Sequence, residues 1–209
     1  MPSRTSGSSV WRAAAWVGVA VVAAGCGSVQ PPRFHSLMPA SASSAKAFSE
    51  AGPLAWEVLP VGIPQGVDQP QWVVRRADGS LAVLEQERWI APLAEELRAA
   101  ITERLTQMLG APLTESGGEM QRRWRIKVDV QRFESSPGVE ARLEALWSVR
   151  AVSGEAASLS CRVEIAQSPG ADGYLGLANA HRQGVRKLGD AIGSALKALS
   201  SGQQGVCSG

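Results

Sequence analysis

Histidine, cysteine and long apolar runs are all scarce in this sequence, and each scarcity argues against a class of protein. The 209 residues include two histidines and three cysteines, without Cys-x-x-Cys or His-x-x-x-His spacing, so no metal or other cofactor is expected. No GxSxG nucleophile turn, GxGxxG loop or P-loop occurs, which argues against a hydrolase and against an ATPase. We therefore expect that the protein is not an enzyme.

The first 25 residues have the pattern of a signal peptide. Arg4 and Arg12 give a basic start, and residues 13–24 form an apolar stretch that is shorter than the ~20 residues of a membrane-spanning helix. Small residues directly precede Cys26, an arrangement that predicts cleavage before Cys26 and lipidation of its thiol. The alternative is an ordinary secretory signal in which Cys26 is incidental. Because Gly27 and not Asp follows Cys26, we expect a lipid anchor on the periplasmic face of the outer membrane.

Removal of this signal would leave a chain without net charge. The whole sequence has 21 Lys and Arg against 19 Asp and Glu, and loss of Arg4 and Arg12 leaves 19 of each sign. A neutral chain with interspersed charges gives no case for binding to nucleic acid.

The mature chain divides into three parts. Residues 26–52 are interpreted as a lipidated tether with a short strand and a mobile loop, because Pro31-Pro32 favours extended backbone and residues 40–52 are small and polar. Residues 53–200 are long enough for one domain with its own core. Residues 201–209 are rich in Gly, Ser and Gln and are expected to be a disordered tail.

Apolar periodicity predicts an α+β domain, in which an antiparallel β-sheet carries two main helices on one face. Residues 93–109 repeat apolar side chains at helical spacing between Pro92 and Gly110, which are typical of a helix start and a helix end. A second amphipathic helix is expected over residues 173–199. Alternation of apolar and polar residues predicts three strands, at residues 122–134, 139–152 and 158–167. Three further extended segments are expected at residues 56–64, 71–76 and 81–87.

A set of motif residues lies between Val58 and Gly110, namely Pro64, Pro70-Gln71, Val73, Arg75, Arg88-Trp89 and Pro92-Leu93. In this order and spacing the region resembles the PqiC-like lipoproteins, also called ABC-type transport auxiliary lipoprotein components. Phe34–Pro39 is similar to the first strand of that family, with His35 and Ser36 as departures. The resemblance implies a non-enzymatic accessory lipoprotein of an MCE-type lipid transport system. Such a protein would tether the MCE-type tunnel protein to the outer membrane, and self-association into a homo-oligomer is a further expectation.

Tryptophan and arginine occur together in this signature region, as Trp72 with Arg75 and as Arg88 with Trp89. Because this pair of residue types is enriched at protein–protein hot spots, the four residues are candidates for partner binding. The alternative is that both tryptophans belong to the core, with their indole N–H groups bonded to the backbone.

Other residues with chemical potential have simpler interpretations. His181 lies on the apolar face of the second helix and is expected to be buried and satisfied, and Glu95-Glu96 are expected to form a solvated face near a helix N-terminus. For Cys161 and Cys207 we favour two free thiols over a disulfide, because Cys161 has inward parity on its strand and Cys207 lies in the tail.

A second function stays open beside tethering. The domain could itself bind a lipid or another small ligand and receive cargo. A pocket deep enough for an acyl chain would favour this alternative, whereas a packed core would favour tethering.

Overall fold

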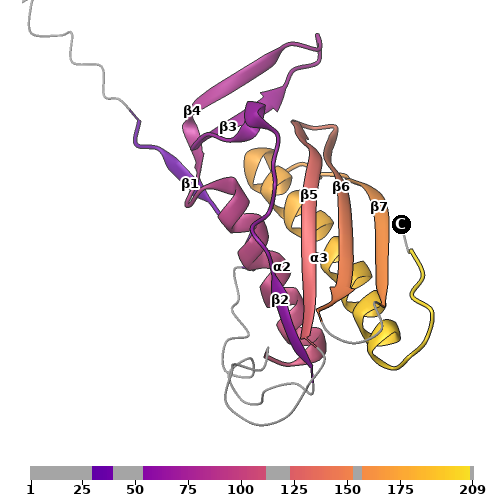
Figure 1. Cartoon of the computed structure of the whole chain (residues 1–209). Coiled ribbons are helices and arrows are strands. Elements are labelled where there is room, and N and C mark those ends of the chain that lie inside the picture. The colour runs from indigo at the N-terminus through magenta and orange to yellow at the C-terminus, as the bar shows by residue number, and fades with distance from the viewer. Residues whose placement is uncertain (1–29, 40–53, 112–122, 153–156, 208–209) are drawn as a thin grey trace, which may run out of the picture. The chain divides into compact units, whose positions relative to one another are not determined.

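Two β-sheets and two α-helices make up the part of the chain that a computed structural model describes, which is residues 30–39, 54–111, 123–152 and 157–207 (Figure 1). In chain order these elements are β1 (Arg33–His35), β2 (Ala55–Val58), a 3-10 turn (Gln65–Val67), β3 (Gln71–Arg75), β4 (Leu81–Trp89), α2 (Leu93–Leu109), β5 (Arg123–Ser136), β6 (Glu140–Ala151), β7 (Ser158–Gln167) and α3 (Gly173–Ser200).

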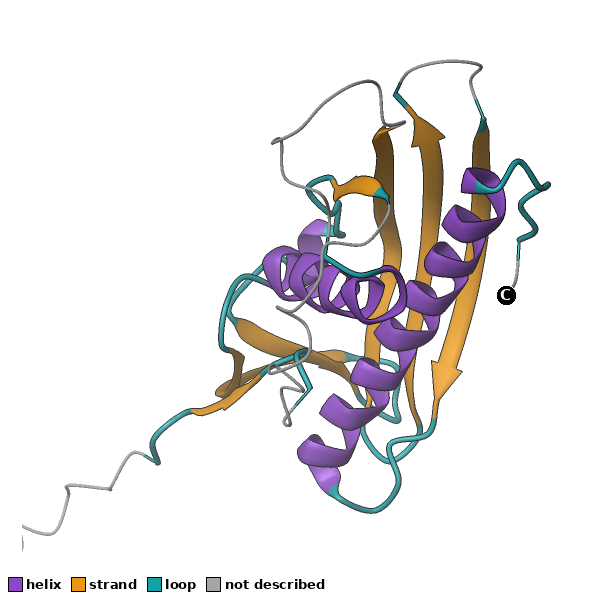
Figure 2. Ribbon diagram, turned by 90° about the horizontal axis from the view of Figure 1, so that it is seen from below, coloured by secondary structure: helices purple, strands orange, loops and turns teal. Residues whose placement is uncertain are grey.

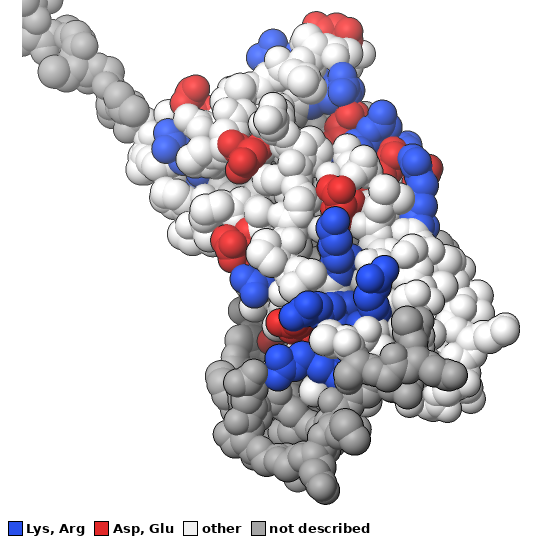
Figure 3. Space-filling view, viewed as in Figure 1, with Lys and Arg blue, Asp and Glu red and all other residues white. Residues whose placement is uncertain are grey.

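The large sheet has the strand order β2-β5-β6-β7. β5, β6 and β7 pair antiparallel, and β2 pairs parallel with β5. Side chains alternate along the strands, so that Ile126, Val128 and Val149 are fully buried on one face while the other face carries interspersed basic and acidic residues (Figure 3). One buried face and one wet face are typical of an antiparallel sheet.

Both helices lie on the same side of the large sheet (Figure 2). α2 begins after Pro92 and ends at Gly110, which has a φ of 81°, as the sequence predicts. The two helices approach closely at two glycines of α3. A Cβ atom on Gly189 would lie 2.8 Å from Arg104 Cγ, and one on Gly193 would lie 2.8 Å from Met108 Cε. Glycine therefore permits side chains of α2 to lie directly on the backbone of α3.

The small sheet has the order β1-β4-β3, with β1 parallel and β3 antiparallel to β4. Its register shifts between Gln71 and Trp72, so that β4 has a bulge opposite the start of β3. The inward face of this sheet buries Trp72, Val74 and Trp89.

The predicted α+β class, with two main helices packed on one face of an antiparallel sheet, is confirmed, but the division of the strands into two sheets was not predicted. The described residues form two mixed sheets, because β1 and β2 add parallel pairings to β4 and β5. These two strands are three and four residues long, too short for alternation to indicate a partner or a direction. The predicted loop at residues 40–52 lies outside the described residues.

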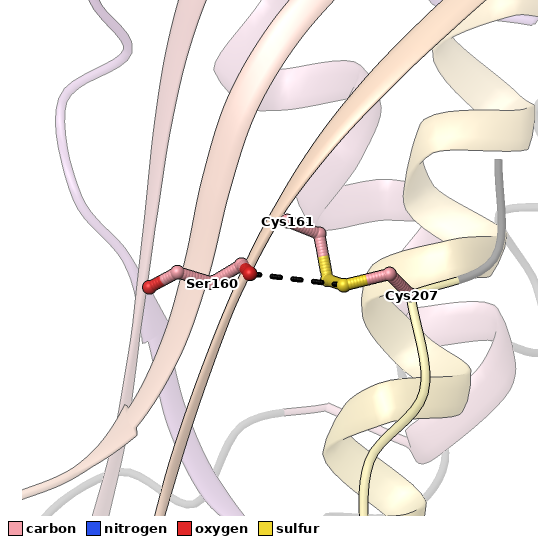
Figure 4. The surroundings of a disulfide bond; sticks show 3 residues. All are labelled: Ser160, Cys161 and Cys207. Atoms are coloured by element: carbon pink, nitrogen blue, oxygen red, sulfur yellow. Dashed lines mark hydrogen bonds between the residues drawn. A yellow bond between two sulfur atoms is a disulfide. The ribbon is translucent and has the colours of Figure 1, made fainter.

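The expectation of two free thiols at Cys161 and Cys207 is wrong. Cys161 on β7 and Cys207 form a disulfide, with their Cα atoms 5.6 Å apart (Figure 4). The structure describes residues 201–207 of the expected tail, where Gly205 packs against Leu159 and Leu199. This packing brings Cys207 beside β7, so the inward parity of Cys161 does not prevent pairing.

Candidate functional site

Trp72 and Trp89 lie at the centre of an aromatic cluster beneath the small sheet. They are 1% and 4% exposed, and their ring centroids lie 4.7 Å apart. Rings from three other elements surround them, namely His35 of β1, Phe133 of β5, and Tyr174 and His181 of α3. Both indoles therefore belong to the core of the isolated chain, where they join the small sheet to β5 and α3.

A buried polar chain runs through this cluster. The Trp72 indole N–H donates to the Ser135 hydroxyl at 2.8 Å, and that hydroxyl lies 2.7 Å from Nε2 of His181. Burial lowers the pKa of His181 to about 3, so the imidazole is neutral at neutral pH and stacks on Phe133 at 4.1 Å. Because an indole can only donate, Ser135 accepts from Trp72, and the direction of its bond to Nε2 of His181 follows the tautomer of the imidazole. The bond to a serine side chain replaces the expected bond to backbone.

The buried side chain of Glu87 on β4 holds strand β1 in place. Its side chain is 3% exposed and contacts Arg33 and His35 of β1, with the histidine Nε2 at 2.6 Å. A buried carboxylate is costly unless it is paired and hydrogen-bonded, and Glu87 has two such partners.

Glu96 on α2 binds the two residues that follow β1, Ser36 and Leu37. It is 6% exposed, and one carboxylate oxygen accepts hydrogen bonds from the Ser36 hydroxyl and the Leu37 backbone N–H, both at 2.7 Å. Arg182 of α3 donates to the Ser36 carbonyl at 2.8 Å. The prediction of a solvated face is therefore wrong for Glu96, because residues 36 and 37 cover the first turn of α2.

The two arginines of the signature region have different surroundings. Arg75 makes two hydrogen bonds to Glu134 of β5, at 2.7 and 2.9 Å, and this hydrogen bonding lowers the pKa of Glu134. Arg88 reaches the Glu85 carbonyl at 3.2 Å and its carboxylate only at 4.0 Å. Arg75 thus connects the two sheets, whereas the Arg88 guanidinium is more weakly held.

The outward face of the small sheet combines these arginines with apolar side chains. Phe34, Leu81, Val83 and Ile90 are 47–61% exposed, and they are four of the nine large hydrophobic residues exposed in the described part of the chain. Phe34 pairs with Arg88, and Leu81 pairs with Arg75, so these residues share one face. We call this surface the outer face of the small sheet.

The structure thus brings all four predicted partner-binding residues to one small sheet, with the two indoles inside and the two guanidinium groups outside. Cys26 lies outside the described residues. The sequence analysis did not assign roles to Glu87 or Ser135, because a carboxylate or hydroxyl with partners about 50 positions away leaves no local pattern. Among the described residues no cluster of His, Cys, Asp and Glu could hold a metal ion.

The fold and this interior define a two-layer α+β domain whose buried polar groups serve the packing of its elements. Residues 35–193 match the family of ABC-type transport auxiliary lipoprotein components. The chain belongs to that family, as the motif residues predict.

A solved structure with low sequence identity supports the fold. A crystal structure of an uncharacterized protein is similar with a TM-score of 0.59 and 16% identity, over 78% of this chain and 97% of that one. A Xanthomonas campestris protein of the DUF330 family gives a TM-score of 0.49 and 16% identity, over 84% and 91%. Comparison with curated proteins gives no match. Within the described residues, no helix has the length and apolar character needed to cross a membrane.

Proposed function

We propose that this protein is a lipid-anchored accessory component of an MCE-type lipid transport system and tethers the tunnel protein to the outer membrane. Acylation of Cys26 would supply the anchor, and the α+β domain would supply the contact with the tunnel protein. Membership of an auxiliary transport lipoprotein family supports a role beside a transporter, without catalysis.

The observation that carries the docking role is the composition of the outer face of the small sheet. Exposed apolar residues with arginines beside them are typical of protein–protein interfaces, in which charged residues other than Arg are depleted. Phe34 is the cross-strand partner of Arg88, Ile90 follows Arg88 by two residues, and Leu81 is the cross-strand partner of Arg75. Trp72 and Trp89 then act from behind, because they fix the sheet that presents these side chains.

Self-association would strengthen this contact. A tunnel built from identical subunits has a symmetric end, which a ring of docking subunits would match. Each subunit would then need only a small contact, since several contacts in one assembly raise the overall affinity.

The alternative of cargo binding has less support. The cores of the large sheet and the helices are filled by buried side chains, and the groove between α2 and α3 is open, with seven polar or charged residues among its eleven lining residues. An open groove of this kind does not enclose a whole acyl chain.

Docking is tested by a pull-down of the full chain with the tunnel protein. Phe34→Ser with Ile90→Ser removes two exposed apolar side chains and should weaken binding by about tenfold or more, the effect of removing interface anchors. Val139→Ser with Leu146→Ser is the matched control, because Val139 in the turn between β5 and β6 and Leu146 on β6 are 67% and 45% exposed. Equal binding by both double variants would show that the outer face of the small sheet does not dock the tunnel protein.

Anchoring is tested separately with Cys26→Ser. The variant should accumulate as an unacylated precursor and should leave the outer-membrane fraction after a salt wash. Retention in that fraction would rule out acylation of Cys26 as the anchor.

A further inference from the structure

A groove in the described part of the chain lies between α2 and α3, beside residues 37–39, and has a volume of about 560 Å³. Its floor is apolar, because Leu37, Ala100 and Val185 are all buried. Three arginines line it, Arg104 from α2 and Arg182 and Arg186 from α3. A volume of this size is in the range of small-molecule sites.

The three guanidinium groups retain N–H donors that face no acceptor in the described residues. Arg104 donates Nε to Asp190 at 2.6 Å and one terminal nitrogen to Gln107, which leaves its second terminal nitrogen free. Arg182 similarly uses Nε for the Ser36 carbonyl and one terminal nitrogen for Asn179. Arg186 is exposed and makes no hydrogen bond or ion pair with any described residue. Each arginine can therefore donate further hydrogen bonds without losing those it already makes.

The acidic residues near these arginines do not fill the groove. Glu103 is the one carboxylate among the lining residues, and its oxygen already accepts from the Gln107 amide at 3.0 Å. Asp190 binds Arg104, and Glu96 is buried beneath residues 36 and 37. Arg182 and Arg186 stand four residues apart on α3, so their like charges are adjacent, an arrangement that is destabilising in the absence of an anion.

The helix crossing brings the third arginine to the same place. Gly189 lacks a side chain where the Arg104 stem crosses α3, and Asp190 next to it holds the Arg104 Nε. An ordinary side chain at position 189 would meet Cγ of Arg104 and displace it. The sequence of α3 thus provides both two of the arginines and the space that the third requires.

We propose that this groove binds a phosphate group that is attached to a small apolar or glycerol moiety, such as the head group of a phospholipid. Guanidinium groups recognise phosphate oxygens through paired N–H donors, and the apolar floor fits the carbon atoms next to the phosphate. This site is distinct from the outer face of the small sheet, and it would let a docked tether contact the head group of a lipid whose acyl chains lie elsewhere.

Isothermal titration calorimetry with the full chain carrying Cys26→Ser tests the site with four probes, inorganic phosphate, glycerol 3-phosphate, dihexanoyl phosphatidylglycerol and dihexanoyl phosphatidylcholine. Arg186→Glu should lower the affinity for the phosphate group at least about tenfold, because it replaces a positively charged donor by a carboxylate that repels phosphate. Lys187→Glu is the matched control. It makes the same change of charge at the next residue of α3, but Lys187 lines a different surface, beside Asp190 and Glu164.

The proposal is supported if the parent binds phosphatidylglycerol, Arg186→Glu abolishes this binding and Lys187→Glu preserves it. If inorganic phosphate binds as tightly as phosphatidylglycerol, the ligand is a free anion and not a head group. Absence of binding by all four probes, or equal loss in both variants, would overturn it. Circular dichroism checks that both variants fold, and Arg186→Ala serves as a second variant if the glutamate disturbs α3. None of these outcomes depends on the pull-down with the tunnel protein, so the two proposals can fail separately.

Discussion

The two sheets of this protein are held in place by different interactions. Three of the four strands of the large sheet, β5, β6 and β7, are 10–14 residues long and pair in antiparallel ladders, and two helices cover its apolar face. The small sheet has strands of three, five and nine residues, and it is attached through aromatic rings, buried carboxylates and the ion pair between Arg75 and Glu134. Backbone pairing and apolar burial therefore stabilise the first sheet, while specific side-chain bonds position the second.

This difference predicts that damage to the large sheet is global and damage to the small sheet is local. Stability that rests on a shared apolar core is lost cooperatively, whereas a peripheral element can open by itself at a lower free energy. The following changes test the comparison, from the largest expected effect to the smallest.

Leu97→Asp or Val128→Asp should unfold the whole domain. Both side chains are fully buried between the helices and the large sheet, and an unpaired charge there costs several kcal/mol. Loss of the circular dichroism signal and of the cooperative thermal transition would show this. A melting temperature only a degree or two below that of the parent would contradict the assignment of these residues to the core.

Acid should weaken the attachment of the small sheet through His181. Its pKa of about 3 in the folded state lies below the ordinary value of 6.5, so between these two values the unfolded chain binds a proton that the folded chain does not. The contribution of His181 to stability is therefore constant above pH 6.5 and falls by up to ~1.4 kcal/mol per pH unit below it.

His181→Gln is the control for this pH dependence, because an amide can bond Ser135 but does not titrate. Urea unfolding at pH 7.5, 5.5 and 4.5 measures both proteins, and the difference between them removes the effect of the carboxylates. Parallel curves for the two proteins would show that His181 does not titrate in the unfolding reaction.

Ser135→Ala should loosen the small sheet and spare the large one. It removes the group that accepts from Trp72 and leaves a buried indole N–H unpaired, a loss of about 1–3 kcal/mol. Hydrogen exchange should accelerate in β3 and β4 before it does so in β6 and β7. Uniform acceleration in both sheets would mean that they unfold as one unit.

Charge reversal at the two arginines should have the smallest effect on folding and should separate their roles. Arg75→Glu faces Glu134 with a like charge and should speed exchange in β3, and adding Glu134→Arg should restore the parent rate. Arg88→Glu should leave exchange unchanged and weaken self-assembly or binding of the tunnel protein, as size-exclusion chromatography and pull-down would show. If Arg88→Glu assembles and binds like the parent, Arg88 is not part of the docking surface.

Periodicity predicted the elements whose partners are apolar and numerous. The helix from Pro92 to Gly110, strand β7 and the long α3 all repeat their buried residues at a regular spacing, and that spacing depends only on local geometry. The extended segments predicted at residues 71–76 and 81–87 correspond to β3 and β4. Their separation into a second sheet was not predicted, and the sequence left open whether the two tryptophans belong to the core or to an interface.

The remaining features depend on contacts that local sequence does not encode. Glu96 looks like any acidic residue in a first helical turn until residues 36 and 37 cover it, and Ser135 resembles a turn residue until Trp72 reaches it. The disulfide required a fold in which the tail returns to β7, so the parity of Cys161 alone gave the wrong answer.

The position of β1 has a mechanical consequence. A pull that travels along the chain from its N-terminal side reaches Arg33 and His35 first, and it loads the Glu87 carboxylate before it can load Ser36 and Leu37 on Glu96. The contacts of Glu87 would therefore break before those of Glu96. Release of the first would remove His35 from its place 4.9 Å from the Trp72 ring, and tension on the chain would thereby begin to uncover the aromatic cluster that holds the small sheet.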